Sequence, residues 1–123
     1  MKRRAQVAPE NSVVLVMDSS AGTVPAAYDG GLIAATASCV VVGTRAQHEG
    51  KTAITLTDDQ VPTGMGLDRA FQGDLETPSG VLGVYTVVGE AIIEVTVSCD
   101  RVGVAIYVND HNEPDVITIH ISH

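Results

Sequence analysis

Apolar and polar residues alternate with a period of two in four segments of the chain, 52–57, 92–97, 102–108 and 117–121. This period is typical of a β-strand that buries one face and exposes the other. Residues that favour turns, such as Gly, Asp and Asn, lie between the segments. The alternation therefore predicts strands whose inward positions form a core of Ile54, Leu56, Ile93, Val95, Val97, Val104, Ile106, Ile117 and Ile119.

Three further segments, 13–17, 32–42 and 81–88, are apolar and β-branched but alternate less regularly, and we expect the second to bend near Ser38. At residues 68–71, where no clear period is present, we expect one short helical turn. The spacing of about one strand every 8 to 15 residues is that of an all-β protein. It predicts a two-layer, mainly antiparallel β-sandwich of about eight strands.

The composition supports strands, because 19 valines, eight isoleucines and 11 threonines make 38 of the 123 residues β-branched. Branching at Cβ restricts the side chain and suits a pleated, half-buried surface. A hydrophobic fraction of 45% excludes a disordered chain. The length predicts a single domain over residues 1–123, in which the polar residues 1–11 form a flexible tail.

Acidic residues outnumber basic ones by 15 to seven, and three of the seven cations, Lys2, Arg3 and Arg4, lie at the N-terminus. Such a body repels phosphate backbones and anionic membrane surfaces and attracts basic partners. We therefore expect a basic protein partner, with neither nucleic acid nor membrane as a ligand. The carboxylates that we expect to contact this partner are Asp58, Asp59, Asp110, Glu113 and Asp115.

The segment 109–115 is the densest cluster of possible oxygen ligands, but it does not fit the spacing of a calcium loop. Turn chemistry explains it better as a hairpin loop. His120 and His123 are three residues apart, which in a strand places them on opposite faces. The Ser19-Ser20 pair lacks the glycine pattern of a nucleophile turn. We therefore expect no catalytic residue, no metal site and no cofactor.

The basic N-terminus is not followed by the apolar run of a secretory signal, so we expect a cytoplasmic protein. Cys39 and Cys99 are then expected to be free thiols. Both lie in apolar strand contexts, which predicts that both are mostly buried.

Two apolar runs, 13–17 and 40–42, contain no charge. If one of them lies at a sheet edge, it can pair with its equivalent in a symmetric homodimer. The alternative is that both are central strands buried on two faces, which their unbroken apolar character also fits.

Residues 41–121 resemble a family of small bacterial β-sandwich proteins that includes competence protein J, an inhibitor of a nuclease involved in DNA uptake. The family has an aromatic residue where this chain has Leu67, and a Tyr-Arg alternation where it has 102–105. The resemblance implies a sandwich fold and brings no catalytic residues. It rests on 42–45 leading into 52–57, on Asp68 followed by 75–82 with its Pro-Ser-Gly turn, on 102–108 and on 116–121.

Two function hypotheses follow. The first is a non-enzymatic interaction module, an inhibitor or immunity-type protein that binds a basic partner such as a nuclease. The second is a sandwich that binds or hydrolyses a small molecule with loop carboxylates that converge in a pocket. The acidic body, the missing active-site motifs and the resemblance favour the first.

Overall fold

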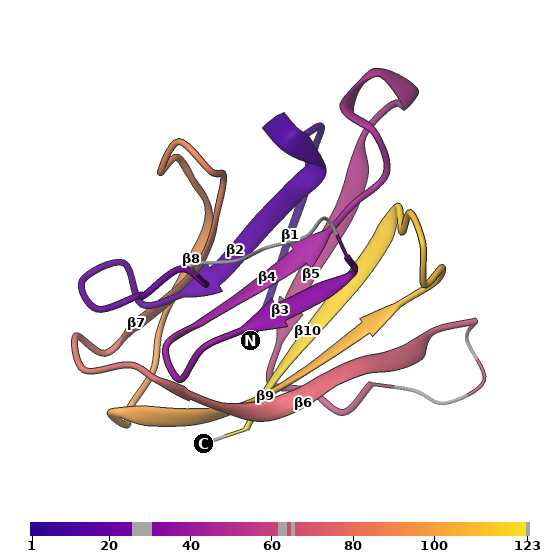
Figure 1. Ribbon diagram of the computed structural model, residues 1–123. Helices are drawn as coiled ribbons and strands as arrows, with labels where there is room; N and C mark the ends of the chain where they lie inside the picture. The colour runs from indigo at the N-terminus through magenta and orange to yellow at the C-terminus, as the bar shows by residue number, and fades with distance from the viewer. Residues whose placement is uncertain (26–30, 62–63, 65, 123) are drawn as a thin grey trace.

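The computed structural model describes residues 1–25, 31–61, 64 and 66–122, and it shows two five-stranded β-sheets packed face to face (Figure 1). Two short 3-10 segments, Glu10–Ser12 (η1) and Gln47–Glu49 (η2), are the helical elements of these residues, and neither is long and apolar enough to cross a membrane. The strands are β1 (Lys2–Val7), β2 (Val13–Met17), β3 (Ile33–Ala35), β4 (Cys39–Gly43), β5 (Thr52–Thr57), β6 (Asp68–Glu76), β7 (Val81–Tyr85), β8 (Ala91–Thr96), β9 (Arg101–Val108) and β10 (Val116–Ser122).

Sheet A has the order β1-β5-β10-β9-β6, and sheet B has the order β3-β4-β2-β7-β8. All neighbouring strands are antiparallel except β5 and β10, which are parallel. The predicted class, a mainly antiparallel two-layer β-sandwich, is confirmed. The described residues contain ten strands rather than about eight.

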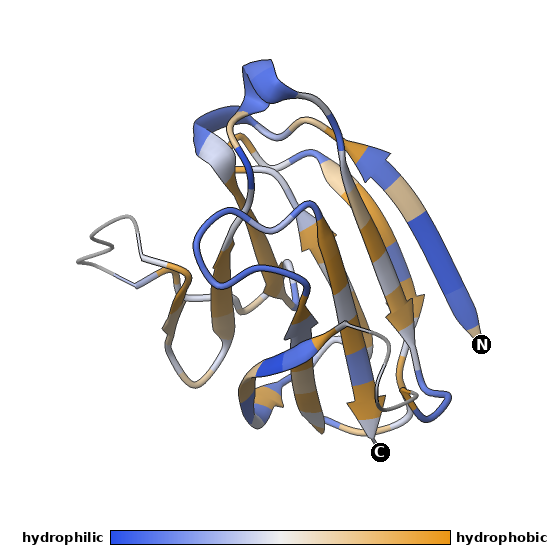
Figure 2. Ribbon diagram, turned by 90° about the vertical axis from the view of Figure 1, so that its right-hand side faces the viewer, coloured by the Kyte–Doolittle hydropathy of each residue, from blue (hydrophilic) through white to orange (hydrophobic). Residues whose placement is uncertain are grey.

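The core lies between the sheets and is built from the inward positions of both. All nine core residues expected from the alternation are buried, with exposed fractions between 0% and 7%. In Figure 2 apolar and polar residues alternate along the strands of sheet A. Because successive side chains of a strand point to opposite faces, this alternation places the apolar ones on the face toward the core. Burial of each such side chain contributes about 1.5–3 kcal/mol.

The N-terminal segment is an edge strand, which corrects the expectation of a flexible tail at residues 1–11. β1 pairs with β5 from Lys2 opposite Thr57 to Val7 opposite Thr52. Ala5 and Val7 pack against the core, whereas the cations on the same strand remain exposed. Figure 2 shows this strand as a hydrophilic ribbon beside the N-terminus. A charged strand is tolerated here because an edge strand faces solvent on one side.

The prediction of a helical turn at 68–71 is wrong, because Asp68–Glu76 form the long edge strand β6. Its pairing with β9 shifts between Arg69 and Phe71, where one residue is inserted as a bulge. The insertion breaks the period-two pattern, which explains why no strand signal is visible there.

The apolar runs 13–17 and 40–42 are central strands, so neither is an edge that can pair with a second copy. β2 lies between β4 and β7, and β4 lies between β3 and β2. Both are buried on two faces, because the outward side chains of β2, β4 and β7 form a second buried apolar cluster of Val13, Leu15, Cys39, Val41 and Tyr85. The segment expected as one bent strand at 32–42 is the hairpin of β3 and β4, which turns at the residues around Ser38.

Candidate functional site

The structure divides the five predicted partner-binding carboxylates between two ends of sheet A. Asp110, Glu113 and Asp115 lie in the loop between β9 and β10, beside the start of β5, where the Ala53 amide donates to the Asp115 carbonyl at 2.8 Å. Asp58 and Asp59 follow the end of β5. The length of β5, at about 3.3 Å per residue, separates the two groups by roughly 20 Å. They do not converge on one site.

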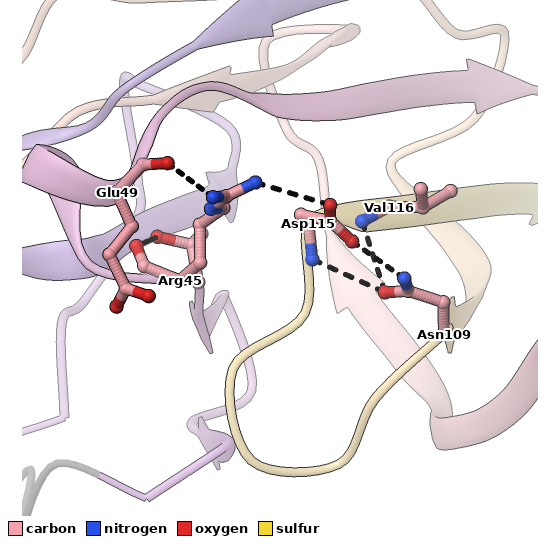
Figure 3. A network of polar contacts seen from close by, with 6 residues as sticks. Arg45, Glu49, Asn109, Asp115 and Val116 are labelled. Atoms are coloured by element: carbon pink, nitrogen blue, oxygen red, sulfur yellow. Dashed lines mark hydrogen bonds and ion pairs between the residues drawn. The ribbon is translucent and has the colours of Figure 1, made fainter.

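The loop 109–115 is held by hydrogen bonds of its own side chains. The Asn109 side chain donates to Asp115 at 2.6 Å and accepts from the amides of Asp115 and Val116 at 3.2 and 3.1 Å (Figure 3). Asp110 accepts the amides of Asn112 at 2.7 Å and Glu113 at 3.2 Å. These last two bonds hold the pKa of Asp110 below its ordinary value, so this exposed carboxylate stays ionised.

Arg45 ties this loop to the segment between β4 and β5. Its amide donates to the Pro114 carbonyl at 2.9 Å, and its Nη1 pairs with Asp115 at 3.3 Å. The Nη2 of the same guanidinium donates to the carbonyl of Glu49, as Figure 3 shows. The guanidinium therefore joins two loops that are 70 residues apart in the chain. Asp115 serves this junction, which leaves Asp110 and Glu113 as the exposed carboxylates of the loop.

Three acidic residues outside the predicted partner-binding set lie at this same end. Asp68 begins β6 opposite Val108, and its carboxylate is 3.5 Å from the imidazole of His111. Its side chain is 77% exposed. Glu49 belongs to η2, and Glu10 belongs to η1, which leads into β2. We call the six carboxylates the acidic loop end; they are Glu10, Glu49, Asp68, Asp110, Glu113 and Asp115.

No motif in the sequence links the members of the acidic loop end, because they come from four separate connections. The pairing of β9 with both β6 and β10 brings Asp68 beside the 109–115 loop. Arg45 and Lys51 are the cations of the connection between β4 and β5 at this end, and Arg45 is already paired. The local surface is therefore strongly acidic.

At the opposite end, Asp58 is engaged within the chain rather than presented to a partner. Its carboxylate pairs with the N-terminal ammonium of Met1 at 3.0 Å. Asp59 lines a hollow of about 250 Å³ together with Lys2 and Arg4. Asp58 therefore has the Met1 ammonium beside it, and Asp59 shares its hollow with two cations of β1. This arrangement makes Asp58 and Asp59 poor candidates for a basic partner.

A buried carboxylate that the sequence analysis passed over lies at the same opposite end. Asp18, with no exposed surface, accepts hydrogen bonds from the amide and hydroxyl of Ser20 at 2.8 and 2.7 Å. Its second oxygen accepts the amide and hydroxyl of Ser79, also at 2.8 and 2.7 Å. Burial raises the pKa of Asp18, but the bonds from Ser79 and Ser20 outweigh it and hold the pKa below the ordinary value. Asp18 joins two loops and is structural.

The remaining candidates are separated in space. His111 lies in the loop before β10 and His120 near the end of that strand, while His123 lies outside the described residues. Both cysteines are free, as expected. Cys39 is buried, and burial raises its pKa to about 11. Cys99 is exposed, so the expectation that both thiols are buried is wrong for this residue, which follows the end of β8 in a turn.

Two packed, mainly antiparallel sheets define this chain as an all-β sandwich protein. It is similar in fold to ComJ from Bacillus subtilis, an inhibitor of the DNA-degrading activity of NucA, with a TM-score of 0.70 and 8% identity over 98% of this chain and 94% of that one. It is also similar to the product of crocagin biosynthetic gene J, with a TM-score of 0.57 and 15% identity over 98% and 97% of the two chains. No family model and no curated protein matches the sequence.

The structural similarity confirms the resemblance stated from the sequence, at the level of the fold. It extends over nearly the whole chain, including β1 and β2, which lie outside the resembling residues 41–121.

Proposed function

We propose that this chain is a protein-binding module of the inhibitor type, which docks on a basic protein through the acidic loop end. The observation that carries the proposal is the loop 109–115, in which the exposed carboxylate of Asp110 and the backbone of Glu113 are fixed in place by hydrogen bonds and by the Arg45 junction. Complementary charge across an interface raises the association rate and excludes wrong partners.

The loop 109–115 is already ordered before a partner binds, and this favours higher affinity. A partner that binds a preformed loop does not have to supply the free energy of ordering it, which is about 0.5–1.5 kcal/mol for each immobilised side chain. The side chains of Asn109, Asp110 and Asp115 already have partners that hold the loop. Glu113 and Asp68 remain exposed beside them. The acidic loop end therefore presents carboxylates on a defined backbone.

A nuclease is the first partner class to test. ComJ, which shares the fold, inhibits a DNA-degrading protein. Proteins that act on DNA present basic surfaces, because they neutralise phosphates with Lys and Arg. An acidic surface on a rigid sandwich suits such a partner. The chain itself carries a net charge of −8, which favours the same choice.

The test follows plasmid degradation by NucA, and by DNA-degrading nucleases of the organism that encodes the chain, with increasing amounts of the purified chain. The variant Asp68→Asn/Asp110→Asn/Glu113→Gln removes three exposed charges. Asn at 110 keeps an oxygen that accepts the two loop amides. We expect the unaltered chain to inhibit one of these nucleases, and the variant to weaken inhibition by at least about tenfold at low salt.

The matched control is Glu76→Gln/Asp100→Asn, which removes exposed charges from the opposite end of the sandwich. It should inhibit like the unaltered chain. Equal inhibition by the unaltered chain and the three-charge variant would show that the acidic loop end is not the binding surface. A failure of the unaltered chain to bind any of the nucleases would reject the proposed partner class.

A further inference from the structure

The outer face of sheet A contains a polar hollow of about 570 Å³ that no part of the proposed function uses. Its floor is strand β9, where the outward residues Gly103 and Ala105 have no side chain or a small one, and the Ser122 side chain lies over Gly103. His120 on β10 and Gln72 on β6 both pair with Ala105, from opposite sides. Two strand spacings of about 4.8 Å place them roughly 10 Å apart. Gln60, in the connection from β5 to β6, also lines the hollow.

The register places a cation and two hydrogen-bonding groups around this floor. Arg69 on β6 is directly opposite Tyr107 on β9, one outward position along from Ala105. His120 lies on the other side of the same floor. Directly opposite side chains on one sheet face have Cβ atoms about 5 Å apart. Arg69, Tyr107 and His120 can therefore contact one ligand together.

In the described part of the chain, the cations of this face are not held in ion pairs, although Asp59 lies in the same hollow as Lys2 and Arg4. Within the described residues, Lys2, Arg4 and Arg69 form no ion pair closer than 4.0 Å. Lys2 and Arg4 line the adjoining hollow of about 250 Å³, which shares Gln60 with the larger one. Three of the seven cations of an acidic chain thus lie on one concave face. These three cations are opposite in charge to the carboxylates of the acidic loop end.

We propose that the larger hollow binds a small molecule with a carboxylate or phosphate group, which pairs with Arg69. A guanidinium presents a planar fork of donors that matches either group, and Tyr107 and His120 supply further hydrogen bonds. The volume lies within the range of small-molecule sites, about 300–1,000 Å³. The ligand class goes beyond the proposed protein partner, and the site is on a different surface.

Among the described residues, Asp74 is the carboxylate that lines the hollow, and it determines the orientation of the ligand. Asp74 is opposite Gly103 and Arg69 is opposite Tyr107, so four residues of β9 separate their positions. At about 3.4 Å per residue the separation is roughly 14 Å. The anionic group of the ligand therefore lies in the Arg69 half, and a hydroxyl or amine at its other end faces Asp74 and Ser122.

The test is a nuclear magnetic resonance titration of the isotope-labelled full chain with inorganic phosphate and, separately, with succinate, at constant ionic strength. We expect saturable shifts centred on the amides of Arg69, Tyr107 and His120, with half-saturation below about 20 mM for at least one of the two anions. The anion that saturates first distinguishes a phosphate ligand from a carboxylate ligand.

Arg69→Gln should weaken binding by about tenfold, because it removes the charge-assisted pair. The matched control is Arg101→Gln, which removes the same charge from the same sheet face outside the hollow. A second variant, Ala105→Leu, fills the floor without changing any charge and should abolish the saturable shifts. The proposal is overturned if neither anion saturates, or if Arg69→Gln and Arg101→Gln weaken binding equally.

Discussion

Replacing Asp18 with Asn should destabilise this protein more than any other change that removes a single negative charge and keeps the shape. The carboxylate is fully buried and accepts four hydrogen bonds, two from Ser20 and two from Ser79. Asn keeps one oxygen, but its amide nitrogen then faces one backbone N–H and one hydroxyl. The hydroxyl can rotate to accept, whereas the backbone N–H cannot.

The size of the effect follows from these contacts. Two hydrogen bonds to a charged group are lost, each contributing about 1.5–3 kcal/mol, and the rotated hydroxyl recovers about 1 kcal/mol. The expected loss in the free energy of unfolding is therefore about 2–5 kcal/mol at neutral pH. A loss of this size is a large part of the total free energy of unfolding of a small domain.

The effect should also depend on pH. The pKa of Asp18 in the folded chain lies below its ordinary value of 3.8, because the serine hydrogen bonds outweigh burial. Its stabilising contribution is therefore complete above the unfolded pKa and is lost as the pH falls through the folded pKa. The difference between the unaltered chain and Asp18→Asn should be constant from about pH 5 to 7 and should shrink below about pH 4.

Urea unfolding of both proteins across this pH range measures the difference directly. The control is Asp100→Asn, an exposed aspartate at the same end of the sandwich, which should change stability by less than about 0.5 kcal/mol. A difference for Asp18→Asn below about 0.5 kcal/mol at pH 7, or one that persists unchanged in acid, would refute the role assigned to the carboxylate.

Three further predictions address the thiols, the N-terminal strand and the core. A thiol reagent should modify the exposed Cys99 rapidly and the buried Cys39, whose pKa is raised to about 11, only on unfolding; two rapid equivalents would contradict this. Removal of residues 1–8 should lower the free energy of unfolding by about 3 kcal/mol, since the burial of Val7 and the hydrogen bonds between β1 and β5 are lost. An unchanged urea midpoint would show that these residues contribute no stability, as expected of a flexible tail. Ile119→Ala, fully buried, should cost about 2–5 kcal/mol by the same measurement, whereas a cost under 1 kcal/mol would place it outside the core.

Much of the fold was predictable from local pattern, because a strand that buries one face must alternate with period two. Ile54, Ile106 and Ile119 identify the inner face of sheet A, and the structure buries all three completely. The same reasoning fails for a strand that does not alternate regularly between a buried and an exposed face. β1 is an edge strand with charged residues, and β6 contains an inserted residue between Arg69 and Phe71. Neither leaves a clean period in the sequence.

The sequence by itself determined the all-β class, the core positions and the acidic character of the chain, because composition and periodicity act locally. The tertiary structure alone decided which charges meet. Parallel pairing of β5 with β10 places Asp58 at one end of sheet A and Asp110 at the other, and pairing of β6 with β9 brings Asp68 and Arg69 to two different surfaces. These neighbours are distant in the chain, and strand order, which local preferences do not encode, determines which of them come together.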